Sequence, residues 1–208
     1  MIDSSANTLF QLLRLALGNK VECNLPSDID WQKVIDLSFD QGVAAIAVDG
    51  LQKSLELSAE SLELALDSPE LEDLKCEWFG ATFQAEEDYS QQVEAISSLA
   101  KTYAQSGISM MLLKDYGLGL NYPIPAHRPT GDVDVFLSDW KRGDELIRCL
   151  GIKVDSGHEH HSTFQFKGQM VENHYDFINT KAHCDAPRIE AKLKELASRE
   201  CKELHINL

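Results

Sequence analysis

The sequence lacks a long hydrophobic run and has few basic residues. No apolar stretch approaches the ~18–20 residues of a transmembrane helix, so we expect no membrane span. Residues 1–7 contain no lysine or arginine, which is unlike the basic start of a secretory signal peptide. With 19 Lys and Arg against 34 Asp and Glu, the net charge is −15. Such a charge repels nucleic acid and anionic lipid when it is spread evenly, so a phosphate-bearing ligand needs local cations.

Paired cysteines are also lacking. The five cysteines are odd in number and form no Cys-x-x-Cys pair. This argues against a disulfide framework and against a cysteine-based zinc site, and we expect reduced thiols in a cytoplasmic protein. The chain has 208 residues, of which 43% are hydrophobic, and this suffices for a core in one domain or two small ones.

The first half of the chain has the apolar spacing of helices. Short helices are predicted from Ser4 to about residue 17, from Asp28 to about residue 41, and over 43–51. After Pro69 no proline occurs before Gln105, and the apolar residues keep helical spacing, which predicts one long helix. Residues 1–105 are therefore predicted to form a helical N-terminal region.

From residue 106 onward the apolar runs become short. Strands are predicted at 108–113 and 133–137, a helix capped by Ser138 follows, and 163–167 and 169–175 flank Gly168 as a hairpin. A last helix is predicted from Asp185 to about residue 201, and 205–208 resembles the start of a strand, as in a fragment of a longer protein. The predicted class is α+β, with a core at 106–208 built on a small mixed β-sheet.

Two aspartates stand where the strand at 133–137 begins, although strands usually exclude aspartate. Because side chains alternate along a strand, Asp132 and Asp134 share one face with their Cα atoms about 6.5 Å apart, while the valines face the core. Two carboxylates so placed repel each other unless a cation lies between them, and a hard divalent ion meets that need. The alternative is a simple turn at Thr130-Gly131-Asp132 followed by an exposed aspartate.

This order of elements resembles the nucleotidyltransferase superfamily with the polymerase-beta-like fold. It is most similar to the uncharacterised bacterial nucleotidyltransferases of the NTP_transf_5 type. In that family a strand ends in Lys-Gly, an arginine precedes Gly-Asp-hydrophobic-Asp, and a later strand carries hydrophobic-acid-x-His. The segments that carry the likeness are MLLKDYGLGLNYPIPAHRPTGDVDVFL at 111–137, HEHHSTFQFKGQMVENHYDF at 158–177 and, more weakly, DWQKVIDLSFDQGVAAIAVDGL at 30–51.

The resemblance implies a catalytic metal site formed by Asp132, Asp134 and Glu172. The two aspartates would bridge two Mg²⁺ or Mn²⁺ ions, and Glu172 would hold the ion on the acceptor side and help to deprotonate an attacking hydroxyl. Lys114 and Arg128 match the family's lysine and arginine and would neutralise the charge of the triphosphate. Without the resemblance, Arg128 is equally compatible with a surface position in a proline-rich loop, and Glu172 with an exposed strand position.

One position departs from the family pattern. The glycine that should follow Lys114 is Asp115, which blocks and repels where a backbone N–H group should approach the triphosphate. Either Gly117 serves nucleotide binding in a shifted loop, or nucleotide binding is weakened or lost.

The histidines at 158, 160 and 161 form a cluster, with His174 and His183 downstream. They are compatible with a transition-metal site or with a solvated loop. A third interpretation follows from the predicted hairpin: His161 and His174, the latter matching the family's histidine, flank the acidic site and touch a phosphate or base of the nucleotide.

The sequence therefore predicts metal-dependent transfer of a nucleotide from an NTP to a hydroxyl or phosphate of an acceptor. The negative charge favours a small molecule or a protein over long nucleic acid as that acceptor. Two alternatives remain open: a catalytically silent binding module of this fold, and one component of a toxin–antitoxin-like pair that acts through a protein partner.

Overall fold

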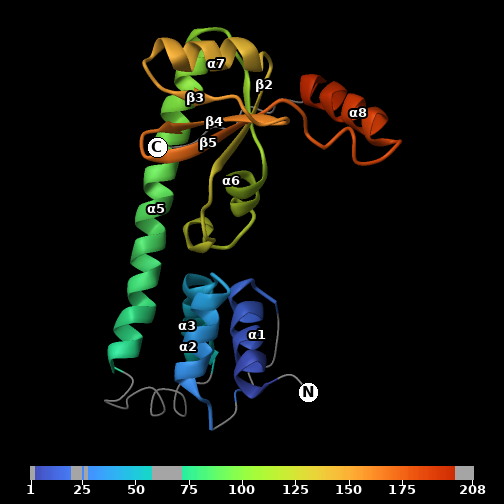
Figure 1. Ribbon diagram of the computed structural model, residues 1–208. Helices are drawn as coiled ribbons and strands as arrows, with labels where there is room; N and C mark the ends of the chain where they lie inside the picture. The colour runs from blue at the N-terminus through green and yellow to red at the C-terminus, as the bar shows by residue number, and fades with distance from the viewer. Residues whose placement is uncertain (1–2, 20–24, 26–27, 58–71, 200–208) are drawn as a thin grey trace. The chain divides into compact units, whose positions relative to one another are not determined.

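A computed structural model describes residues 3–19, 25, 28–57 and 72–199 of the chain (Figure 1). Its contacts group the chain into two compact units, Met1–Ser90 with Leu118–Thr130, and Gln91–Gly117 with Gly131–Leu208. The structure confirms the α+β class, with helices before a mixed five-stranded sheet. The predicted domain division at residue 105 stays a prediction. None of the described helices combines the length and the apolar composition that crossing a bilayer requires.

The first unit is helical. It contains α1 (Ser4–Ala16), α2 (Trp31–Asp40), α3 (Ala44–Leu57), the beginning of α5 (Glu72–Gln105) and the short 3-10 helix η2 (Pro125–His127). Gly50 of α3 allows close contact with α1, because a Cβ there would lie 2.0 Å from the carbonyl oxygen of Leu12. The apolar faces of these helices meet in one core that includes Leu9, Leu12, Trp31, Val34, Ile35, Val48, Leu51 and Trp78.

The second unit is built on the sheet, whose strand order is β1-β2-β5-β4-β3. Its strands are β1 (Met110–Leu112), β2 (Val133–Leu137), β3 (Val154–Asp155), β4 (His161–Phe166) and β5 (Gln169–His174). Among the strands that the structure describes, β2 and β5 pair in parallel and the other neighbours are antiparallel. The predicted hairpin is confirmed, and its turn uses Lys167 and Gly168, both with positive φ, as a two-residue hairpin turn requires.

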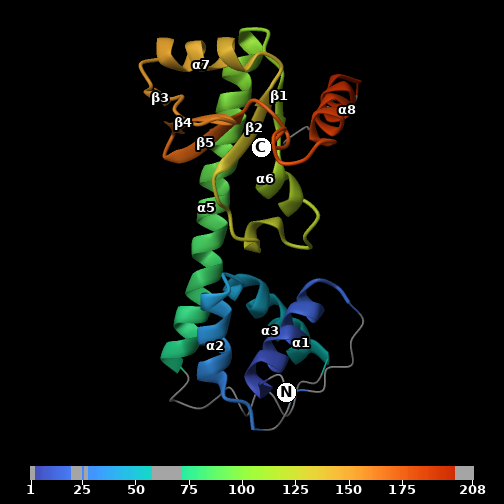
Figure 2. The ribbon, with the colours of Figure 1, turned by 45° about the vertical axis from the view of Figure 1, so that its right-hand side comes forward.

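One face of β2 is covered by helices. Val133, Val135 and Leu137 are buried, as the alternation predicted. Gly143 of α7 (Trp140–Cys149) lies against Leu137 and near the ring of Tyr103 from α5. Figure 2 shows the later half of α5 running behind the strands, with α7 along the top of the sheet. The opposite face of β2 is therefore left for Asp132 and Asp134.

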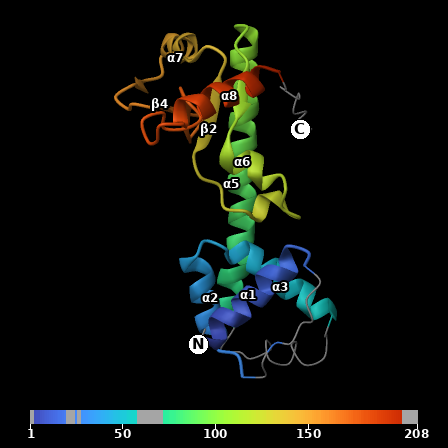
Figure 3. The same cartoon turned by 90° about the vertical axis from the view of Figure 1, so that its right-hand side faces the viewer.

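Two short helices complete this unit. Helix α6 (Lys114–Gly119) follows β1 directly, and α8 (Ala186–Arg199) lies outside the sheet, on the side that faces the viewer in Figure 3. The buried carboxylate of Glu190 on α8 accepts hydrogen bonds from the backbone N–H groups of Phe177 and Ile178. The ring of Phe177 stacks on Phe136 of β2 at 4.2 Å between centroids, which ties α8 to the sheet.

Some predicted details at the helix ends were wrong. The side chain of Asp139, not of Ser138, caps α7 by accepting from the backbone N–H of Arg142. The hydroxyl of Ser138 instead accepts from the backbone N–H of Ser109, beside β1. Leu150, the C-cap residue of α7, is 52% exposed. The predicted start of the long helix at 68–69 and the predicted strand at 205–208 lie outside the described residues.

Candidate active site

The acidic residues of β2 and β5 meet because these two strands pair in parallel. Asp134 is the register partner of Glu172, and Phe136 is that of His174. On the other side of β5, His161 of β4 is the register partner of His174. Three neighbouring strands thus contribute carboxylates and imidazoles to one face of the sheet.

Asp134 is the most buried of these groups, with 3% of its surface exposed. Its Oδ1 accepts a hydrogen bond from Nζ of Lys114 at 2.9 Å. The same oxygen lies 2.6 Å from Nε2 of His174, which donates when that nitrogen is protonated. A buried carboxylate is stable only with such partners, so Asp134 is organised to face a positive charge.

Asp115 also belongs to this group, which the sequence did not predict. One carboxylate oxygen from each of Asp115, Asp132 and Asp134 lies within 4.8 Å of the others. Lys114 enters α6 with φ of +43°, so the chain turns sharply at the end of β1. Asp115 then faces the site beside Gly131, where a Cβ would lie 3.2 Å from its Oδ2.

Glu172 is bracketed by two imidazoles. Nε2 of His174 lies 3.3 Å from its Oε2, and Nε2 of His161 lies 3.7 Å from its Oε1. The rings of His161 and His174 are 5.4 Å apart, and His158 stacks on His161 at 4.7 Å. Burial lowers the pKa of His161, although the charge of Glu172 opposes this shift; the three other histidines nearby reinforce it.

The electrostatic balance of the site rests on Lys114. The hydrogen bond with Asp134 raises the pKa of the Lys114 ammonium, and the negative charges of Asp134, Glu172 and Asp132 raise it further, against a smaller opposing effect of burial. The Lys114 side chain is nevertheless 62% exposed. Solvent therefore screens this ion pair, and the lysine can move to another anion at small cost.

A buried polar network supports the site strands from the opposite face of the sheet. Asp144 of α7 is 1% exposed, and its Oδ1 accepts from Oγ of Ser162 at 2.7 Å and from Nδ2 of Asn173 at 2.8 Å. Ser162 follows His161 in β4, and Asn173 stands between Glu172 and His174 in β5. One carboxylate therefore fixes both strands that carry the histidines.

Gly117 and Arg128 are the remaining residues predicted to bind the nucleotide. Gly117 lies within α6, three residues after Lys114. Arg128 belongs to the first unit, where its guanidinium donates to the carbonyl of Pro129 and lies 6.0 Å from the ring of Tyr122. It also lines a cavity of about 320 Å³ whose other walls come from α2, α3 and α5. The roles of Gly117 and Arg128 stay predictions.

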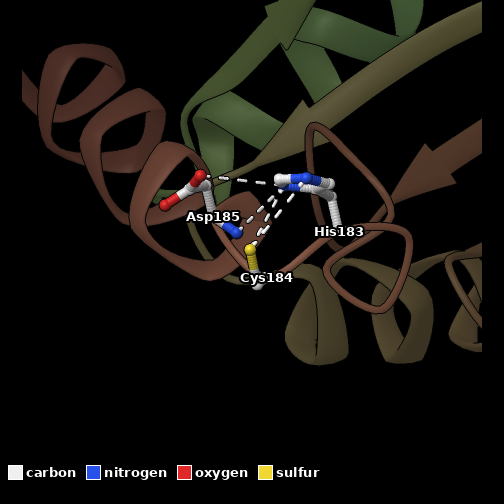
Figure 4. A group of neighbouring side chains, drawn as sticks. All are labelled: His183, Cys184 and Asp185. Atoms are coloured by element: carbon white, nitrogen blue, oxygen red, sulfur yellow. Dashed lines mark hydrogen bonds and ion pairs between the residues drawn. The ribbon is translucent and has the colours of Figure 1, made fainter.

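Another cluster of potential metal ligands lies just before α8. His183, Cys184 and Asp185 are consecutive and exposed, and their side chains approach one another (Figure 4). Nδ1 of His183 accepts a hydrogen bond from the backbone N–H of Asp185 at 3.2 Å. These contacts explain the arrangement as local turn structure.

Comparison with known proteins identifies the family. A sequence profile of the family described as uncharacterised nucleotidyltransferase, NTP_transf_5, matches residues 27–208. The chain belongs to this family. Membership confirms the resemblance, and it indicates nucleotidyl transfer with an NTP as substrate. Searches of curated proteins and of solved structures gave no match.

The donors on the sheet fit a divalent cation, which such transferases usually require. Two groups of potential ligands share Asp134: Asp115 and Asp132 complete one, and Glu172 and His174 complete the other. The ligand atoms within each group lie within 4.8 Å of one another. Carboxylate oxygens are the donors that hard divalent ions prefer, so nucleotidyltransferase chemistry and the residues present agree.

Proposed function

We propose that the protein transfers a nucleotide from an NTP to a hydroxyl or phosphate of an acceptor, in a reaction that requires Mg²⁺ or Mn²⁺. The observation that carries this proposal is the convergence of Asp115, Asp132 and Asp134 beside Glu172, in a chain of the nucleotidyltransferase family. Asp134 and Glu172 lie on one face of the sheet, Asp132 directly precedes β2 and Asp115 approaches from α6. The mutual repulsion of carboxylates so gathered is relieved by a divalent ion.

The roles of the residues follow from their positions. Asp132 and Asp134 would hold the metal, with Asp134 shared between the two groups of ligands. Glu172 would complete the acceptor side and take the proton of an attacking hydroxyl. When bound, two divalent ions would supply charge stabilisation for in-line displacement at the α-phosphorus, in which the acceptor oxygen forms the new P–O bond and pyrophosphate leaves. The exposed ammonium of Lys114 would turn from Asp134 to the triphosphate.

The net charge limits the choice of acceptor. At −15, the chain repels a long polyanion over most of its surface. A small molecule with a free hydroxyl or phosphate, or a side chain of another protein, meets less repulsion. We therefore propose a small-molecule or protein acceptor, with histidines 161 and 174 and Arg128 as further contacts of the nucleotide.

A labelling experiment tests this function. The protein is incubated with cell lysate and NTPs labelled at the α- or the γ-phosphate, with Mg²⁺, with Mn²⁺ or with chelator. Nucleotidyl transfer predicts that only the α-label enters an acceptor and that chelator abolishes it. Asp132→Asn and Asp134→Asn should lose the transfer, while Glu145→Gln, at an exposed position on α7, should retain it.

Asp115 supports one alternative, because this acid stands where the family has a glycine and repels the triphosphate. A catalytically silent module, including one half of a toxin–antitoxin-like pair, would bind metal or a partner without any transfer. Stable complex formation with a lysate protein, unaffected by Asp134→Asn and without α-label in any acceptor, would favour that alternative.

A further inference from the structure

The centre offers two chemically unequal sets of metal ligands. We propose that His174 is a metal ligand, so that Asp134, Glu172 and His174 form a site that favours divalent first-row transition metals over Mg²⁺. The set Asp115, Asp132 and Asp134 contains oxygen donors alone and suits Mg²⁺. This inference deepens the proposed function and rests on it, because it assigns a ligand to the metal centre on which that function depends.

The geometry places the His174 nitrogen where a ligand should be. Nε2 lies 2.6 Å from Oδ1 of Asp134 and 3.3 Å from Oε2 of Glu172. Two ligands at about 2.1 Å from one ion, at right angles, lie about 3 Å apart. Each of the two distances from Nε2 differs from that spacing by only a few tenths of an ångström.

The surroundings of His174 hold its ring toward the acids. Its side chain is 13% exposed. On the same strand, the neighbouring Asn173 is fully buried and bonded to Asp144, which fixes the backbone of β5 at this point. The ring atom that faces the site, Nε2, is already within reach of both carboxylates.

The donor type sets the preference among metals. Imidazole nitrogen adds affinity for Co²⁺, Ni²⁺ and Zn²⁺, whereas Mg²⁺ binds oxygen and keeps its water ligands. Asp134 belongs to both sets, so ions in the two sites would share one carboxylate. The result would be a mixed centre, with a transition ion on the Glu172 side and Mg²⁺ on the Asp115 side.

Pulsed EPR of bound Mn²⁺ tests the ligand directly, because it detects a nitrogen nucleus bonded to the ion. We expect a ¹⁴N coupling in the parent protein, which changes to the ¹⁵N pattern when histidine is supplied with ¹⁵N in the ring. His174→Gln should remove the coupling. The matched control is His158→Gln, an exposed histidine that stacks on His161, and it should retain the coupling.

Competition between Co²⁺ and Mg²⁺, followed by calorimetry, tests the preference. In His174→Gln the ratio of the two affinities should fall by at least about tenfold, as expected for loss of a residue that contributes to a metal site. The ¹⁵N measurement on the parent needs no variant, so the absence of a nitrogen coupling there overturns the inference even when His174→Gln fails to fold.

The outcomes separate the two proposals. Mn²⁺ that binds the parent and requires Asp134, but shows no nitrogen coupling, overturns the role of His174 and leaves the proposed function standing. Failure of the parent to bind Mn²⁺, with or without NTP, overturns both. If the nitrogen coupling is lost in His158→Gln and kept in His174→Gln, the metal-bound nitrogen does not belong to His174. That result also overturns this inference.

Discussion

Thermal stability with and without metal tests the acidic site in the most direct way. A ligand that binds only the native state at ~100 times its Kd adds ~2.7 kcal/mol to the free energy of unfolding. For a chain of 208 residues, each kcal/mol raises Tm by ~2–4 °C, so saturating Mn²⁺ should raise the Tm of the parent by ~5–11 °C. The variant Asp134→Asn should lose most of this shift, because Asp134 belongs to both groups of ligands.

The metal-free variant provides a second measurement. Asp134→Asn removes a negative charge from beside Asp115, Asp132 and Glu172, which relieves repulsion, but it also weakens the contacts of Lys114 and His174 with a buried oxygen. The Lys114 pair is solvent-screened, so its loss costs little. These effects oppose each other, and we expect the Tm in chelator to stay close to that of the parent.

Melts of parent and variant, each in Mn²⁺ and in chelator, give the answer. Glu145→Gln is the control, since it removes an exposed acid on α7 and should leave the metal shift intact. Equal Mn²⁺ shifts in the parent and in Asp134→Asn, or no shift in the parent, would falsify the metal-site reasoning.

Three further predictions concern other residues. Lys114→Met should weaken NTP binding and strengthen Mn²⁺ binding, both measured by calorimetry, because the ammonium competes with metal for Asp134. Gly50→Ala should lower the urea-unfolding free energy by ~1–3 kcal/mol or more, since its Cβ meets the Leu12 carbonyl, whereas Gly80→Ala, with open space around it in α5, should raise it by ~0.8–1 kcal/mol. Asp144→Leu should cost ~1–3 kcal/mol for each of its two buried donors in the same assay, and Asp144→Asn should restore part of the loss.

Each of these has a result that contradicts it. Unchanged NTP affinity in Lys114→Met removes the lysine from the nucleotide site. A stability gain in Gly50→Ala would show that the two helices are not in backbone contact there. If Asp144→Leu unfolds at the same urea concentration as the parent, the buried network does not hold the site strands.

The strong periodic signals in the sequence predicted the main elements of the fold. The bounds of β2 agree with the apolar run at 133–137, and the long helix and the hairpin around Gly168 were both found. The spacing of apolar residues in these elements fits either a helix or a strand but not both, and Gly168 marks the turn of the hairpin. The predicted N-cap of α7 was wrong because Ser138 and Asp139 are both favourable N-cap residues. The side chain of Ser138 accepts a hydrogen bond from Ser109 instead, and Asp139 caps the helix.

The pattern within one strand predicts which side chains share a face, but it does not predict which other segments lie beside that strand. Alternation along β2 put Asp132 and Asp134 on one face, and the resemblance supplied Glu172. The sequence predicts that Asp115 blocks nucleotide binding and does not predict its place among the acids, because local pattern does not state which strand lies beside β2 or in which direction. The antiparallel register pairs Leu112 with Val135, and the sharp turn at Lys114 just beyond it brings Asp115 beside Gly131 and within ligand distance of Asp132.

The pair Lys114-Asp115 also explains how the site differs from a Lys-Gly turn. The left-handed backbone conformation, which glycine adopts without strain, falls on Lys114 here, at a cost of ~1–2 kcal/mol. Its bond to the buried Asp134 offsets part of that cost. The two adjacent residues are opposite in charge. Where a Lys-Gly turn lets backbone N–H groups approach a phosphate, this turn offers the carboxylate of Asp115, a potential metal ligand. Binding of nucleotide should therefore depend on metal more strongly than a glycine turn would require, since the ions must provide the positive charge that backbone N–H groups would otherwise share.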